Sequence, residues 1–152
     1  MGEFTGKAVA LAFRNYDGID KIIYGDAKLT VNALGSSPSA TMLLSFPGMY
    51  DINFSRLWIE SDKAGWTGGK GELISSTSVL PTVTDKGAEA LGYGFGDGAV
   101  TLDPAKGPAV LAGQFFGKDK ANATEAVGSF GLKDTQRDSG HGVYGTFGVV
   151  KK

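Results

Sequence analysis

Large and small side chains alternate near the start of the chain, between residues 4 and 14. The odd positions Val9, Leu11 and Phe13 are large, whereas the even positions among them are alanines. Successive side chains of a β-strand point to opposite faces, and curved barrels often carry large residues on one face and small residues on the other. This pattern predicts a strand whose large residues fill a barrel interior.

Similar alternation continues along the chain, which predicts about eight strands in all. The other predicted strands cover residues 22–31, 41–46, 49–60, 66–75, 108–116, 126–133 and 143–150. Within 49–60 the apolar face changes from Ile52 and Phe54 to Leu57 and Ile59, which indicates a β-bulge near residues 55–56. Residues 76–91 show no clear period and predict a long loop, residues 92–102 predict a short hairpin, and residues 118–125 could form one helical turn.

These segments predict an all-β domain over residues 1–152, folded as a closed antiparallel up-and-down barrel of about eight strands. No segment longer than about ten residues has the 3.6-residue apolar period of a helix. We expect the interior to be packed. The predicted core residues are Val9, Leu11, Phe13, Leu29, Val31, Phe130 and Phe147.

The composition agrees with this fold and excludes several kinds of functional site. The 24 glycines have no regular period and suit sharply curved strands and tight turns. A net charge of −1 offers no field to attract nucleic acid, and the lack of cysteine excludes disulfides, thiolate metal sites and cysteine nucleophiles. No apolar run reaches the roughly 18 residues of a spanning helix.

Catalytic and cofactor motifs are weak. His141 is the only histidine, in a predicted turn, so a catalytic triad or a multi-histidine metal site is not expected, although a single axial haem ligand is conceivable. The run GFGDGA at 94–99 partly matches a dinucleotide-binding pattern but lacks the helix that the pattern needs. Scattered aspartates such as Asp17, Asp26 and Asp97 do not have the spacing of a calcium loop. We therefore expect no enzyme, no metal and no cofactor.

The second half of the chain carries repeated clusters of glycine and aromatic residues. The run GQFFGKDKANATEAVGSFGL (113–132), followed by GVYGTFGVVKK at the end of the chain, resembles the C-terminal barrel of the transferrin-binding protein B superfamily. The segments FTGKAVALAF and ATMLLSFPGMYDINFSRLWIE resemble the first half of such barrels. One departure is the segment after Gly117, where many family members begin with proline and asparagine.

This resemblance implies a domain of a Gram-negative surface lipoprotein or of a secreted relative, exported with the help of a surface lipoprotein assembly modulator at the outer membrane. It implies a partner that is a host protein, such as haemoglobin, transferrin or a complement factor, or a haem-bearing protein. The role that it implies is host-protein binding or the acquisition of haem and iron. It also implies an N-terminal handle domain and lipid anchor that this chain would lack. The ligand differs among members, so the fold does not identify it.

Two predicted loops carry large apolar residues where solvent is expected. Met49 and Tyr50 follow the Pro-Gly turn, and Val79, Leu80 and Val83 lie in the 76–91 loop. Connections after odd strands share one rim of an up-and-down barrel, so these residues are our candidate partner-binding site. The alternative is that they plug the barrel end. Trp58 and Trp66, near the opposite rim, leave the same two possibilities open.

The leading prediction is therefore a non-catalytic binding or export domain. The alternative is a lipocalin-like carrier of a small apolar ligand, which needs a wide interior cavity. A membrane-spanning barrel is disfavoured because the last strand ends in Val-Val-Lys-Lys rather than in an aromatic residue.

Overall fold

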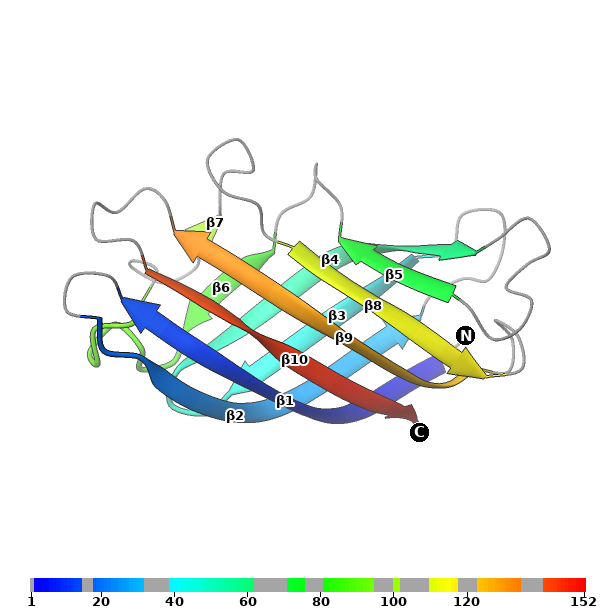
Figure 1. The fold of residues 1–152 in the computed structure, drawn as a ribbon, viewed down its shortest axis with the longest axis horizontal. Coiled ribbons are helices and arrows are strands. Elements are labelled where there is room, and N and C mark those ends of the chain that lie inside the picture. Colours follow the sequence, from blue (N-terminus) through cyan, green and yellow to red (C-terminus); the bar gives the residue numbers. More distant parts are fainter. Residues whose placement is uncertain are drawn as a thin grey trace.

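The computed structural model describes residues 2–14, 18–31, 39–61, 71–75, 81–94, 100–101, 110–117, 123–134 and 141–152. Eight antiparallel strands follow one another around a closed barrel (Figure 1), which confirms the predicted fold. Each strand pairs with the next in chain order, and pairing of the last with the first closes the ring. The strands are β1 (Gly2–Arg14), β2 (Lys21–Val31), β3 (Ser39–Phe46), β4 (Tyr50–Ser61), β5 (Gly71–Ser75), β8 (Val110–Gly117), β9 (Ala123–Asp134) and β10 (His141–Lys151).

Two further short strands lie outside this ring, in a region predicted as loop and hairpin. Strand β6 (Thr82–Asp85) pairs with the first residues of β4, beside the point where β5 pairs with the last residues of β4. Strand β7 (Val100–Thr101) pairs with β6. The prediction of an irregular loop over residues 76–91 is therefore wrong for β6, whose four residues are too few to establish an alternating pattern.

Two finer predictions concern the bulge and the helical turn. The bulge is confirmed: Ala40 pairs with Leu57 and Met42 with Phe54, so residues 55 and 56 of β4 lie opposite the single residue Thr41. The helical turn is not found in the part that is described, because residues 123–125 begin β9, while residues 118–122 lie outside the described residues. The described ranges contain no helix of the length and apolarity needed to cross a membrane.

The barrel interior is a packed apolar core, as predicted, but the first strand contributes to it in the opposite phase. Leu29, Val31, Phe130 and Phe147 are buried, which confirms four of the predicted core residues. In β1, however, the alanines at 8, 10 and 12 point inward and are at most 5% exposed. Val9 is 39% exposed, and Leu11 and Phe13 are half-buried, so their assignment to the core is wrong.

The physical reason for this inversion is the size of the side chains on the other strands. Phe46 packs against Phe130 with 6.2 Å between ring centroids, and Phe147 lies over the glycines of β8 and β9. These rings take up much of the interior, so little room is left there for side chains of β1. A Cβ added at Gly145 would come 2.7 Å from the Cβ of Ala10, which shows how little space remains between β1 and β10. Because close packing limits the total volume inside, the large residues of β1 face outward.

The two ends of the chain lie side by side (Figure 1). Phe4 pairs with Lys151, and the Lys152 amide donates a hydrogen bond of 2.9 Å to the Glu3 carbonyl oxygen. The Glu3 carboxylate also lies 3.4 Å from the ammonium of Lys152 and 3.5 Å from that of Lys28. Desolvation alone would raise the pKa of the Glu3 carboxyl, but the two lysines hold that pKa below its ordinary value of 4.5.

Candidate functional site: an apolar outer face

The candidate partner-binding residues do not stand on an exposed rim. Met49, Tyr50 and Val83 are 3%, 0% and 1% exposed, so the prediction that they present an open binding surface is corrected. Val79 and Leu80 lie outside the described residues. The pairing of β6 with β4 places Val83 opposite Ile52, on the inner side of the sheet. Met49, Tyr50 and Val83 plug the barrel end, which was the alternative interpretation.

Hydrogen bonds hold the turn at residues 86–92 next to Met49. The Met49 carbonyl oxygen accepts hydrogen bonds from the amides of Lys86 and Ala88, at 2.8 Å and 3.1 Å. The Asp85 carboxylate accepts hydrogen bonds from the amides of Gly87 and Glu89, at 3.1 Å and 2.8 Å. Burial of Tyr50 raises the pKa of its phenol, because the anion would be formed among apolar groups. The turn at 86–92 is therefore an ordered cover over one end of the barrel.

The same cover is tied to the end of β1. Arg14 donates a hydrogen bond of 2.8 Å to the Leu91 carbonyl oxygen, and its guanidinium lies 4.5 Å from the ring centroid of Tyr93. The Tyr93 hydroxyl donates a hydrogen bond of 3.2 Å to the Ile19 carbonyl oxygen, just before β2. A cation over an aromatic ring and two hydrogen bonds thus join parts of the chain that lie far apart in the sequence. They leave the outer side of β1 and β2 uncovered among the described residues.

That outer side carries a continuous apolar surface, which we call the outer face and define by Val9, Leu11, Ile22, Tyr24 and Tyr144. These five outward-pointing residues come from three neighbouring strands, β1, β2 and β10. Cross-strand pairing aligns them in rows: Leu11 lies between Ile22 and Tyr144, and Val9 lies between Tyr24 and Thr146. Ile22, Tyr24 and Tyr144 are 60%, 72% and 53% exposed. Several large apolar residues exposed together are a feature of interaction surfaces.

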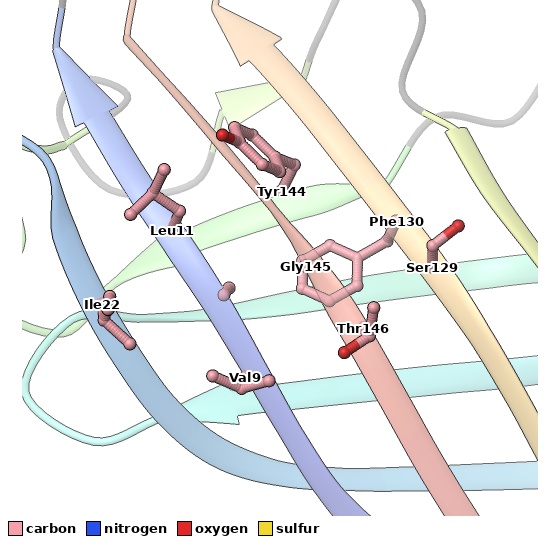
Figure 2. A pocket seen from close by; sticks show the side chains of 9 residues that line it. Val9, Leu11, Ile22, Ser129, Phe130, Tyr144, Gly145 and Thr146 are labelled. Atoms are coloured by element: carbon pink, nitrogen blue, oxygen red, sulfur yellow. The ribbon is translucent and has the colours of Figure 1, made fainter.

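A shallow hollow of about 510 Å³ lies within this outer face. Figure 2 shows Val9 and Leu11 on β1, Ile22 on β2 and Tyr144 on β10 around it. The hollow reaches β9 at Ser129. Ala10 and Gly145 also contribute to its lining, and neither places a large side chain there. The hollow is open to solvent and apolar, which suits an inserted apolar side chain better than a charged ligand.

Tyr144, which lines the hollow, packs against Phe13. The rings of Phe13 and Tyr144 lie 5.7 Å apart at 51°. The Phe13 ring also covers Gly142, where an added Cβ would collide with it. An aromatic side chain laid over a neighbouring glycine protects the strand backbone and stiffens the sheet. Tyr144 therefore packs against Phe13 on one side while half of its surface remains exposed.

A charged border follows the apolar rows toward the chain termini. The Lys7 ammonium lies 2.7 Å from a carboxylate oxygen of Asp26 on the next strand, and both side chains are exposed. These two residues form the row directly after Val9 and Tyr24. An apolar patch with a polar margin has the composition of a protein-contact surface.

The remaining candidates are not brought together. His141 begins β10 instead of lying in a turn before it, and Asp17 and Asp97 lie outside the described residues. Asp26 pairs with Lys7. Within the described ranges no three His, Cys, Asp or Glu residues are grouped as a metal site would require. Trp58 is exposed on β4 with the Arg56 guanidinium 4.7 Å from its ring, while Trp66 lies outside the described residues.

Sequence reasoning missed the outer face because it assigned β1 to the wrong phase. The alternation in β2 correctly places Tyr24 on the face that points away from Leu29 and Val31. Once Tyr24 is known to face solvent, its pairing with Val9 in the antiparallel sheet turns Val9 outward as well. This inference about Val9 requires the register between β1 and β2, which the sequence alone does not provide.

No family model matches this chain, no curated protein matches it, and no solved structure matches it.

Proposed function

We propose that this barrel is a non-catalytic protein-binding domain whose contact surface is the outer face. The observation that carries the proposal is the row of exposed apolar and aromatic side chains across β1, β2 and β10. Side chains of this kind lose water when a partner covers them, which is the main source of affinity in protein interfaces. Rigid strands present them, so a partner meets a preformed surface.

The packed interior supports a binding surface outside the barrel over a carrier site inside it. A cavity wide enough for a small ligand would leave its lining accessible to water. The inward-facing core residues of the described strands are instead at most 7% exposed. Phe46, Phe130 and Phe147 are among these buried side chains, which favours a contact surface on the outside of the barrel.

The resemblance to the transferrin-binding protein B superfamily suggests where such a domain would work and what it would bind. In this proposal the chain belongs to a protein that is exported to the surface of a Gram-negative cell, or secreted, with the help of the outer-membrane export machinery. Its partner would then be a host protein such as haemoglobin, transferrin or a complement factor. A mostly uncharged apolar face fits a protein surface, because nucleic acid would require a basic one.

The experiment is a binding measurement against purified haemoglobin, transferrin and complement factor H, each immobilised in turn. Three forms of the domain are compared: the unchanged protein, Tyr144→Ser, and the control Trp58→Ser, which removes an exposed aromatic residue from β4. We expect at least one host protein to bind, and Tyr144→Ser to weaken that binding at least about tenfold, equivalent to ~1.4 kcal/mol. Trp58→Ser should bind normally. Equal binding by Tyr144→Ser and the unchanged protein would refute the outer face as the contact surface.

A further inference from the structure

We propose that a second copy of this chain occupies the β1–β2 side of the outer face, about a two-fold axis that runs between these strands and parallel to them. This inference rests on the proposed function, since it names one partner of the same face. The axis lies in the plane of contact, so the two barrels meet with their outer faces toward each other.

The register of β1 and β2 makes this arrangement self-complementary. A two-fold axis between the strands sets β1 of one copy against β2 of the other, row by row. Because Val9 pairs with Tyr24 within one chain, Val9 of each copy meets Tyr24 of the other. In the next row Leu11 of each copy meets Ile22 of the other. The more exposed side chains of β2 therefore meet the less exposed ones of β1, and Tyr24, the most exposed of them, lies near the hollow of the second copy.

Charge fixes the position of the axis. Lys7 and Asp26 are directly paired across β1 and β2, and their side chains are 85% and 63% exposed. An axis between the strands brings Lys7 of each copy to Asp26 of the other, so four charges alternate in sign. An axis centred on β1 would instead set Lys7 against Lys7, which costs free energy through like-charge repulsion. A network of four alternating charges is also worth more than an isolated surface ion pair.

The size of the patch indicates a weak dimer. Three rows of side chains on β1 and β2, with the edges of the neighbouring strands, span roughly 20 Å along the strands and 15 Å across them, or on the order of 300 Å² per copy. A standard stable interface buries about 800 Å² per partner, and smaller ones belong to transient complexes. We therefore expect a transient dimer with a dissociation constant on the order of 100 µM.

The decisive experiment uses two opposite charge substitutions, Lys7→Asp and Asp26→Lys, with mass measured by sedimentation equilibrium. The unchanged protein should dimerise as its concentration rises through the expected dissociation constant. Each variant alone should stay monomeric, because like charges then meet across the axis. An equimolar mixture should dimerise again, because the two carboxylates of the Lys7→Asp chain then meet the two ammonium groups of the Asp26→Lys chain. Mixing cannot repair the like-charge pair inside each variant chain, so recovery on mixing is specific to the contact between copies.

A second measurement covers the case in which a charge variant fails to fold. The chain has no cysteine, so Val9→Cys and Tyr24→Cys proteins each carry a single thiol. Under mild oxidation a mixture of the two should form a disulfide-linked heterodimer faster than either protein alone forms a homodimer. Equal rates in all three samples would overturn the arrangement.

A wild-type protein that remains monomeric at concentrations well above the expected constant would overturn the dimer itself. That result would not refute the proposed function. The proposed function is refuted by a different result, namely normal binding of host proteins by Tyr144→Ser. Tyr144 lies on β10, outside the two strands that flank the axis.

Discussion

The ring of Phe147 on β10 occupies the space that a side chain at Gly128 on β9 would need. A Cβ at Gly128 would come 2.6 Å from the ring and 2.5 Å from the Ala112 carbonyl oxygen. Gly128→Ala should therefore destabilise the protein by about 1–3 kcal/mol through overpacking. Gly131→Ala, in the same strand, is the matched control, because its Cβ would meet nothing closer than 3.7 Å. Urea denaturation of both variants checks this, and equal stability would contradict the packing described.

Truncation of core residues should separate the inner and outer faces of the strands. Phe130→Ala removes a buried ring and should cost about 3–5 kcal/mol. Val9→Ala removes two methyl groups from a residue that is 39% exposed, so it should cost less than about 1 kcal/mol. Phe13→Ala should fall between them, since its half-buried ring covers Gly142. Thermal denaturation orders the three variants, and a loss for Val9→Ala as large as that for Phe130→Ala would place Val9 inside the barrel.

A feature of the fold could be predicted from the sequence where residues of the same segment determine it, and could not where distant residues determine it. The phase of β2 follows from the sequence because its outer positions include Asp26 and Lys28, which mark the solvent side. Both faces of β1 are apolar around Val9 and Ala10, so its phase depends on how much of the interior the side chains of the other strands fill. The rings that take up this space belong to residues 46, 130 and 147, and their position is known only once the barrel is closed.

The candidate site was predicted less well than the fold for the same reason. Met49 and Tyr50 follow a Pro-Gly turn, and nothing local indicates that β6 will pair alongside them. The outer face, in contrast, is spread over β1, β2 and β10, whose residues become neighbours only through strand register. A binding surface assembled in this way has no contiguous sequence motif.

The cover at the barrel end should depend on Asp85. Its carboxylate accepts two backbone hydrogen bonds, so Asp85→Ala leaves the amides of Gly87 and Glu89 without this acceptor. We expect a loss of about 1–2 kcal/mol of unfolding free energy. Asp85→Asn keeps one acceptor oxygen and should lose less. Amide hydrogen exchange at residues 86–90 should become faster in Asp85→Ala, and unchanged exchange there would show that the carboxylate does not hold the turn.

Closure of the barrel at the chain termini should depend on pH through Glu3. Lys152 and Lys28 hold the pKa of the Glu3 carboxyl below 4.5, so the folded state favours the ionised form. The stabilisation is present above pH 4.5 and is lost as the pH falls through the lowered pKa of the folded state. Melting temperatures of the unchanged protein and Glu3→Gln should therefore differ at about pH 7 and converge at about pH 3. A difference that persists at the acidic pH would contradict this linkage.

The central claim is that the large residues of β1 face outward, and cysteine labelling tests it most directly. The chain has no native thiol, so Val9→Cys and Ala10→Cys each introduce one reporter at adjacent positions of the strand. Val9 is 39% exposed and Ala10 is 4% exposed. In the native protein a polar maleimide should label Val9→Cys at least about a hundredfold faster than Ala10→Cys, whose thiol must await unfolding. Faster labelling at position 10 would mean that Ala10 points to solvent and Val9 into the barrel. The outer face, on which the proposed function rests, would then not exist.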